Sequence, residues 1–235
     1  MIITKFIMVA VIGYLLGSIP FGLLVSRRVG KVDVRQYGSG RTGAANVLRI
    51  AGGKVAAMVL GLDLLKGALA VVFAGLIVGR DYLVVGGFGW GVLVAQVIAA
   101  LAAMAGHNRS VFLRFRGGGR SVATFFGGLL ALCPPAALFG GEVFIIGTGL
   151  TKFVSLGSIA GAVSTYAILV PLIIRNRFPI EYLAYALIGT IVIMVMHRDN
   201  IARLMSGKER KLGDKAKAKG LSLPTNPESQ DSQGP

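Results

Sequence analysis

The sequence predicts an all-α polytopic membrane protein with seven transmembrane helices, an N-terminus outside the cytoplasm and a cytoplasmic C-terminus. The first observation behind this is composition: of 235 residues, 54% are hydrophobic and 15% are charged, and the mean hydropathy is +0.72. The second is that several uninterrupted apolar stretches approach the ~20 residues needed to cross a bilayer. The third is that Lys and Arg gather at alternate connections, as they do on cytoplasmic flanks. An ordinary soluble domain is thereby excluded.

Seven apolar stretches are expected to form the spans. They are 3–26, 55–79, 83–106, 121–135, 136–150, 154–174 and 179–197. The first is too long for a removable signal peptide, and no small-residue cleavage site follows it. Pro134 and Pro135 divide the fourth stretch from the fifth, because a proline ends one helix and can begin another. A single kinked helix over these two stretches is the alternative.

The distribution of positive charge decides between these two topologies. With seven spans, 20 Lys and Arg residues lie on cytoplasmic segments and four lie on external ones. Merging the fourth and fifth spans moves the C-terminal segment outside and changes the ratio to 13 against 11. Seven spans is therefore the prediction. Residues 1–212 are expected to form the membrane domain, and the polar residues 213–235 a disordered cytoplasmic tail.

Composition also limits the partners and cofactors. The net charge of +15 is spread over span flanks and not over a separate basic domain, so no nucleic acid is expected. The single cysteine, Cys133, lies in apolar sequence and cannot form an intrachain disulfide. Two distant histidines, one cysteine and few carboxylates make no metal-ligand set. Neither a Walker A motif nor a Ser-His-Asp arrangement is visible, and no metal or cofactor is expected.

Polar segments interrupt the apolar sequence at the cytoplasmic edges of the spans. They are 35–46, 115–120, 151–158 and 197–203. Glycine lets backbone N–H groups close on an oxyanion, and Arg supplies charge and a planar fork of donors. Positive-inside anchoring would explain charge alone, but it needs neither Gly-rich turns nor residues such as Ser39, Asn46 and His197. Together the segments indicate a site for an anionic, phosphate-bearing substrate at the membrane surface.

Ionisable residues also occur inside or at the end of spans. Asp63 and Lys66 are three residues apart in 55–79, so they share a helix face and can pair, at a depth where each charge costs ~2.5–3.5 kcal/mol or more. Both a structural ion pair and a brace for the substrate loop are open interpretations. His107 follows 83–106, where a helix cap is commoner than a catalyst. His197 is the stronger candidate, because Asn200 and Arg203 follow it at helical spacing.

Motifs occur in order along nearly the whole chain, from Gly17 to about Gly213. They are Gly17–Gly22, Gly38–Arg49, Leu62–Gly67, Gly106–Thr124, Val154–Ser158 and His197–Glu209. This set resembles the PlsY-type family of bacterial acyl-phosphate-dependent glycerol-3-phosphate acyltransferases. The resemblance implies seven spans in the bacterial inner membrane, an outside N-terminus and a cytoplasmic active site. It also implies transfer of an acyl group from acyl-phosphate to the 1-hydroxyl of glycerol 3-phosphate, giving lysophosphatidic acid without metal, nucleotide or acyl-CoA.

The resemblance carries site residues over by position. It implies a glycerol-3-phosphate site, with catalytic roles, of Ser39, Arg49, Arg120, His197 and Asn200. Substrate-binding roles, which include the cradle for the acyl-phosphate head group, fall to Gly40, Arg41, Thr42, Gly43, Asn46, Arg116, Gly117, Gly118, Ser155 and Arg203. Supporting roles fall to Asp63, Lys66 and His107. The acyl chain is expected between helices, open to membrane lipid.

The chain departs from the family pattern at three places. Arg41 stands where Asn is usual, and Ala45 stands where Thr is usual. The usual Lys-Gly-Gly-Lys-Gly core reads Arg-Gly-Gly-Gly-Arg over 116–120, with Gly119 as an additional residue. The rest of the chemistry agrees with the residues, because acyl-phosphate is an activated anhydride and positioning supplies much of the acceleration. A substrate phosphate is the hypothesised proton acceptor.

Two other functions are considered. A transporter or flippase for a phosphorylated metabolite or lipid would use the arginines as a transit site, but no convincing internal repeat is found in the sequence. A non-enzymatic membrane scaffold would explain the basic tail, but it leaves the placement of Gly, Asn and Ser residues unexplained. The acyltransferase is therefore the predicted function.

Overall fold

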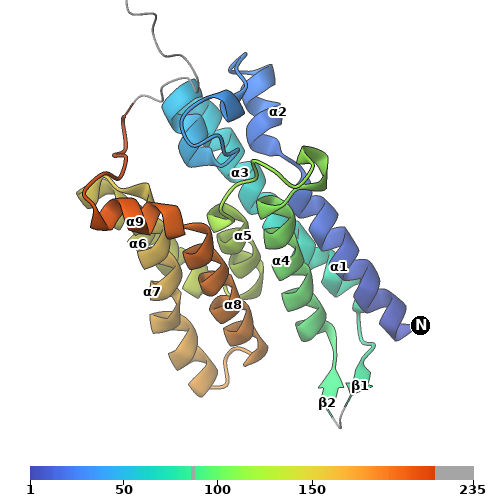
Figure 1. Cartoon of the computed structure of the whole chain (residues 1–235). Helices are drawn as coiled ribbons and strands as arrows, with labels where there is room; N and C mark the ends of the chain where they lie inside the picture. Colours follow the sequence, from blue (N-terminus) through green and yellow to red (C-terminus); the bar gives the residue numbers. More distant parts are fainter. Residues whose placement is uncertain (86–87, 215–235) are drawn as a thin grey trace, which may run out of the picture.

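The computed structural model describes residues 1–85 and 88–214, and this part of the chain is almost entirely helical (Figure 1). Its elements are α1 (Ile2–Ser18), α2 (Phe21–Arg28), the 3-10 helix η1 (Val34–Gln36), α3 (Ala44–Val78), β1 (Leu83–Val85), β2 (Phe88–Trp90), α4 (Val92–Asn108), the 3-10 helix η2 (Val111–Leu113), α5 (Val122–Leu132), α6 (Pro134–Thr151), α7 (Val154–Ile174), α8 (Glu181–Met196) and α9 (Arg198–Met205). Most of the tail predicted to be disordered, from residue 215 on, lies outside the described residues.

Several helices are long and apolar enough to cross a membrane. Within the described residues there are four such segments: Ile2–Arg28, Ala44–Val78, Val92–Leu113 and Val154–Ile174. The pair α8 and α9, bent by 59° at His197, is a fifth, and α5 is a shorter apolar helix. These lengths and compositions are those of an integral membrane protein with four or five clear spans. The count of seven spans remains a prediction.

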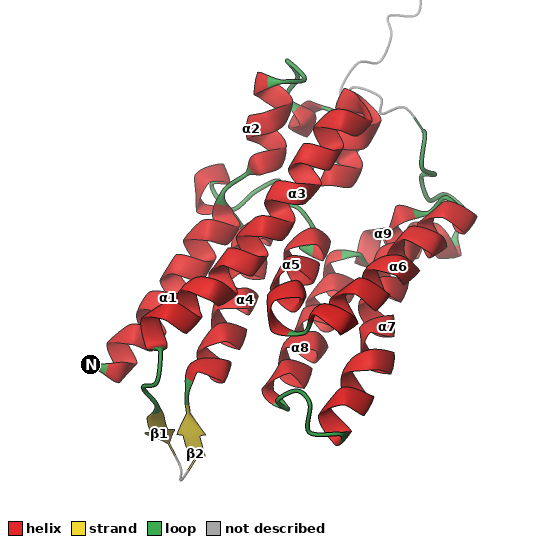
Figure 2. Cartoon of the chain, turned by 180° about the vertical axis from the view of Figure 1, so that it is seen from behind, coloured by secondary structure: helices red, strands yellow, loops and turns green. Residues whose placement is uncertain are grey.

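The chain runs back and forth between two ends of the molecule through α1, α3, α4, α5, α6, α7 and α8 (Figures 1 and 2). The N-terminus and the β1–β2 hairpin lie at one end, and α2 and α9 lie at the other. Backbone hydrogen bonds join the loops at the α2 and α9 end of the molecule. Thr42 N–H donates to the carbonyl of Gly117 at 3.2 Å, and Leu212 N–H donates to that of Lys152 at 2.6 Å.

The observed helices differ from the predicted spans at three places. The first stretch is broken at Ile19-Pro20 into α1 and α2, because proline cannot continue a helix. Residues 44–51, predicted as loop, are helical and join the second span through a kink at Gly52, whose φ of 82° suits glycine. The prediction for 83–106 was wrong over its first residues. Instead, Leu83–Val85 and Phe88–Trp90 pair as antiparallel strands, in which valine and aromatic residues favour the extended backbone.

One predicted stretch and one predicted division between helices are confirmed. The stretch 154–174 is α7, residue for residue. The fourth and fifth stretches are two helices, α5 and α6, and not one kinked helix. Cys133 separates them, and Pro134 and Pro135, predicted at the end of the fourth stretch, instead occupy the first turn of α6, where a missing N–H costs nothing.

The core that holds the site is centred on α5. Phe125 and Leu129 of α5 are fully buried, and the hydroxyl of Tyr185 on α8 donates to the carbonyl of Phe125 at 2.9 Å. Small residues bring helices close on either side. A side chain on Gly157 of α7 would overlap Thr148 of α6, so this glycine lets the two helices pack closely. The ends of α3, α5, α6, α7 and α8 therefore surround one space.

Candidate active site

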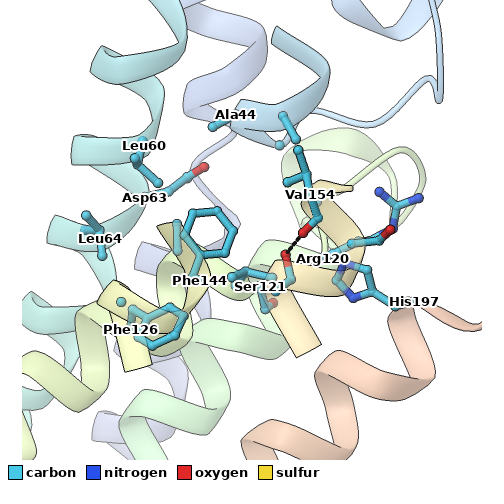
Figure 3. Close-up of a pocket in the computed structure, with 18 of the residues that line it drawn as sticks. Ala44, Leu60, Asp63, Leu64, Arg120, Ser121, Phe126, Phe144, Val154 and His197 are labelled. Atoms are coloured by element: carbon cyan, nitrogen blue, oxygen red, sulfur yellow. Dashed lines mark hydrogen bonds between the residues drawn. The ribbon is translucent and has the colours of Figure 1, made fainter. Parts of the chain in front are cut away.

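A cavity of about 430 Å³ opens at the end of the molecule that carries α2 and α9. All four predicted polar segments contribute to its polar part, through Ser39, Arg41, Gly43, Asn46, Gly119, Arg120, Ser155, His197 and Asn200, and Arg49 of α3 joins them. Its other part is apolar and lies between helices, along Leu60, Leu64, Phe126, Leu130, Ala137, Leu138, Phe144 and Ile145. Figure 3 shows Arg120 and His197 beside each other at one end, and Leu60, Leu64 and Phe126 at the opposite side. The cavity can thus hold a molecule with an anionic head and an apolar chain.

The loop before α3 is shaped by Asn46. The Asn46 side-chain amide donates to the carbonyl of Val34 at 3.0 Å and to that of Arg41 at 2.9 Å. Its Oδ1 accepts the backbone N–H of Ser39 at 3.2 Å. Most of the hydrogen-bonding capacity of this amide is therefore used within the loop. Asn46 lines the cavity, and its predicted contact with substrate remains a prediction.

Asp33 pairs with some of the nearby arginines and leaves Arg41 without a carboxylate partner among the described residues. Sequence reasoning did not single out Asp33. Its carboxylate accepts hydrogen bonds from Arg35 at 2.7 and 3.0 Å and from Arg27 at 2.6 Å. The hydrogen bond from Arg35 is the main reason that the pKa of Asp33 lies well below its ordinary value. Arg27 and Arg35 thus share one carboxylate at the surface. Arg41 has no such partner among the described residues and faces the cavity.

The arginines that line the cavity make hydrogen bonds only to backbone carbonyls. Arg41 donates to Gly119 at 3.4 Å, Arg49 to Arg210 at 3.3 Å and Arg120 to Met196 at 3.2 Å. The Arg49 Nε atom is buried without a partner among the described residues. Burial lowers the pKa of Arg41, and burial followed by repulsion from Arg41 and Arg203 lowers the pKa of Arg120 to about 10. An anion in the cavity would relieve both effects.

His197 lies at the bend between α8 and α9, beside Arg120 (Figure 3). Its Nδ1 is 2.8 Å from the carbonyl oxygen of Ile193. Because a carbonyl oxygen only accepts, Nδ1 carries the hydrogen, and the other ring nitrogen, Nε2, remains available. His197 is buried and lines the cavity, so Nε2 is the one uncommitted polar atom of this side chain.

Glu209 joins two of the predicted polar segments, 151–158 and 197–203, and sequence reasoning gave it no role. It accepts hydrogen bonds from Ser155 Oγ at 2.9 Å, Asn200 Nδ2 at 2.6 Å and Arg203 Nε at 2.7 Å. Its side chain is only 4% exposed. Three residues predicted to bind substrate thus bind this carboxylate. The sequence did offer an indication of this role, since Glu209 is the only acidic residue between Asp199 and Asp214 in a strongly basic segment.

Asp63, Lys66 and His107 form a second buried group next to the cavity. Asp63 Oδ1 lies 2.8 Å from Lys66 Nζ and 3.5 Å from His107 Nδ1, so the predicted pairing of Asp63 with Lys66 is confirmed. Lys66 Nζ also donates to the carbonyl of Ile19, at the break between α1 and α2 (3.0 Å). Gly119, the additional residue, packs on this group, and a side chain there would overlap the His107 ring.

Some predicted residues lie outside the main cavity. Gly40, Arg116 and Gly117 line a separate open hollow with Arg35 and Arg114, and Thr42 and Lys66 line a small adjoining space. Gly118 packs against the backbone of Asn108. Arg203 donates to Glu209 and does not line the main cavity. Among the described residues, no three His, Cys, Asp or Glu side chains are grouped as metal ligands. The roles predicted for individual residues remain predictions.

Comparison with known proteins finds one family. The family described as glycerol-3-phosphate acyltransferase matches residues 7–207. Glycerol-3-phosphate acyltransferase 3 of Dehalococcoides mccartyi strain CBDB1 is 60% identical over 92% of this chain and 100% of its own. The glycerol-3-phosphate acyltransferase of Synechococcus sp. strain JA-2-3B'a(2-13) is 43% identical over 86% and 92%.

A solved structure is similar as well. The crystal structure of PlsY (YgiH), an integral membrane glycerol 3-phosphate acyltransferase, in its glycerol 3-phosphate form superposes with a TM-score of 0.74. It is 33% identical in sequence, over 88% of this chain and 94% of that one. The lysophosphatidic acid form of the same protein gives a TM-score of 0.74 at 32% identity, over 89% and 96%.

Proposed function

Because the chain belongs to the glycerol-3-phosphate acyltransferase family, we propose that it transfers a fatty acyl group from acyl-phosphate to the 1-hydroxyl of glycerol 3-phosphate. The products are lysophosphatidic acid, the first acylated intermediate of phospholipid synthesis, and inorganic phosphate. The substrates enter from the cytoplasmic side of a bacterial inner membrane, and the chain crosses that membrane seven times with its N-terminus outside.

The observation that carries this proposal is the shape of the main cavity. Three arginines, Arg41, Arg49 and Arg120, meet in its polar part, and no acidic side chain among the described residues forms a salt bridge with any of them. The same cavity continues between helices along an apolar wall. Two phosphates fit the first part, one from each substrate, and an acyl chain fits the second. A transit path for a phosphorylated solute would instead need a polar route onward to the opposite end.

The reaction itself needs little beyond positioning and charge. The oxygen of the 1-hydroxyl attacks the acyl carbon, a new ester C–O bond forms, and the C–O bond to the phosphate breaks. Because phosphate is a good leaving group, holding the hydroxyl near the acyl carbon supplies much of the acceleration. Arginine N–H groups in a water-poor site stabilise the negative charge that develops on the departing phosphate. Arg41 and Arg120 are the residues best placed for this, from opposite loops.

The proton of the hydroxyl has two possible acceptors. In our proposal it passes to the departing phosphate, which leaves as hydrogen phosphate. His197 Nε2 is the alternative, because Nδ1 is committed to Ile193. The variant His197→Gln separates them: loss of turnover with unchanged binding of both substrates assigns the proton to His197. A loss confined to the KM of glycerol 3-phosphate assigns it to phosphate, with His197 as a binding residue.

The proposed reaction is tested with the purified protein in detergent, palmitoyl-phosphate and glycerol 3-phosphate. Released phosphate and lysophosphatidic acid are expected in equal amounts, while palmitoyl-CoA gives no product. Arg49→Ala is expected to be inactive, because it removes a guanidinium whose Nε lies buried without a partner among the described residues. Product from palmitoyl-CoA and none from palmitoyl-phosphate would overturn the proposed donor. No product from either in folded protein would overturn the reaction.

A further inference from the structure

Glu142, in the middle of α6, is the only charged residue between positions 121 and 151. Its side chain is exposed, and it lines the apolar part of the main cavity with Leu138 and Ile145 of the same helix. Among the described residues, no cation lies within ion-pair distance of its carboxyl group. An isolated ionisable group at this depth is costly in a membrane, and such groups usually face a cavity and have a function.

Helix geometry gives the depth of Glu142 below the polar part of the cavity. Gly157 of α7 lies level with the turn of α6 between Phe144 and Thr148, since a side chain on that glycine would overlap both residues. Glu142 is about four residues deeper than the middle of this turn, and Ser155 is two residues nearer the polar end of α7. At about 1.5 Å per residue, the carboxyl therefore lies about 9 Å deeper than Ser155. It is placed beside the path of an acyl chain, well below its head group.

We propose that Glu142 determines which acyl chains the enzyme accepts, by favouring donors whose chain ends before it. This inference rests on the proposed function. A chain that extends past Glu142 displaces water from the carboxyl group and offers it no hydrogen bond, which is unfavourable. A shorter chain fills the apolar wall above Glu142 and leaves the carboxyl hydrated. The charge is thus a specificity element in a cavity whose other deep walls are apolar.

The groove itself extends beyond Glu142. Leu138 lies one helical turn deeper on α6 and lines the same cavity, together with Ala137. A longer chain therefore has apolar side chains to contact once the carboxyl is removed. It follows that Glu142→Leu should extend the range of donors toward longer chains. It also follows that a carboxyl at position 138 in that variant should move the limit one turn deeper.

The test is a competition among decanoyl-, myristoyl-, palmitoyl- and stearoyl-phosphate in the same detergent micelles, with the lysophosphatidic acids measured by mass spectrometry. Product ratios report relative kcat/KM and do not depend on how much of a variant is folded. Glu142→Leu is expected to raise the stearoyl-to-decanoyl ratio about tenfold, as for removal of an unpaired polar group from an apolar contact. Glu142→Gln should raise it less, and Leu138→Glu with Glu142→Leu should restore discrimination at a longer chain.

The matched control is Ile146→Glu, which places a carboxyl on the exposed face of α6 outside the cavity lining. It should leave the ratios as in the wild type. Identical ratios in the wild type and Glu142→Leu would overturn the inference, as would an equal shift in Ile146→Glu. Failure of the wild type to use any acyl-phosphate would overturn the proposed function instead, so the two failures are distinct.

Discussion

Two groups of charged side chains, one buried and one partly buried, lie at the same cavity and differ in how their charge is balanced. In the Asp63 group, the carboxylate has Lys66 at 2.8 Å and His107 at 3.5 Å, and Lys66 also binds the carbonyl of Ile19. In the arginine group (Arg41, Arg49 and Arg120), the guanidinium groups make hydrogen bonds only to backbone carbonyls, and Arg120 is repelled by Arg41. The charges of the first group are balanced by ion pairs within it, whereas among the described residues no ion pair balances the second.

This difference predicts separate consequences for the two groups. A buried pair that is internally compensated contributes to the fold, and breaking it leaves an uncompensated charge. A set of partly buried like charges opposes the fold, and a ligand of opposite sign relieves the repulsion. Substitutions in the Asp63 group should therefore act mainly on stability, and those in the arginine group on activity.

The largest effect is expected from Lys66→Met, which leaves the Asp63 carboxylate buried without its lysine. Breaking such a pair costs about 3–5 kcal/mol, and both side chains are almost fully buried here. Thermal unfolding in detergent should show a large drop in Tm. The double variant Asp63→Leu with Lys66→Met should recover most of it, because no lone charge remains. If Lys66→Met keeps its Tm but loses affinity for glycerol 3-phosphate, the Asp63 group belongs to the substrate site.

The next effect in size is expected from Arg120→Ala, which removes one donor from the arginine group. We expect kcat/KM to fall about 10²- to 10³-fold, as for loss of one charge-stabilising donor. The Tm should stay the same or rise, because a desolvated and repelled charge is removed. Arg116→Ala is the matched control, since it lies in the same loop but lines the other hollow. An equal loss in both variants would mean that the loop acts only through net charge.

Gly119→Ala is expected to affect both groups by a smaller amount. The added methyl group would overlap the His107 ring on one side, and the neighbouring residue is Arg120. Overpacking of this kind costs about 1–3 kcal/mol. Both Tm and kcat should fall, because the loop must move. Gly61→Ala on α3 is the control, because a methyl group added there meets no neighbour within 4 Å among the described residues, and both Tm and kcat should stay unchanged. Full activity of Gly119→Ala would show that this loop adjusts without moving Arg120.

The sequence predicted the helical membrane fold and the segments that form the site, because both depend on local patterns. Apolar stretches of sufficient length marked the helices, and α7 was placed residue for residue. The pairing of Asp63 with Lys66 followed from their spacing on one helix. The strands Leu83–Val85 and Phe88–Trp90 were missed, because the apolar sequence continues into α4 and the length of the stretch favoured one helix.

Other parts of the site depend on contacts between distant residues and could not be read locally. Asn46 was predicted to bind substrate, but only the folded loop shows its amide bound to Val34 and Arg41. Glu209 is 54 residues from Ser155 and becomes its partner when the segment after α9 folds back. In the sequence, the only indication of a role for Glu209 was that it is a single acidic residue in its segment, and the same is true of Glu142 in α6.

The smallest effect expected is a stabilisation by inorganic phosphate, and it sharpens the comparison between the two groups most directly. Phosphate that binds the arginine group stabilises the folded protein by RT ln(1 + [L]/Kd), about 1 kcal/mol at a few times Kd. The Tm should rise with phosphate and not with chloride at equal ionic strength. Lys66→Met should keep this rise despite its lower Tm, because the Asp63 group is already balanced. Arg120→Ala should lose most of it. An equal rise in Arg120→Ala would place the phosphate elsewhere, with the hollow lined by Arg35, Arg114 and Arg116 as the next position to test.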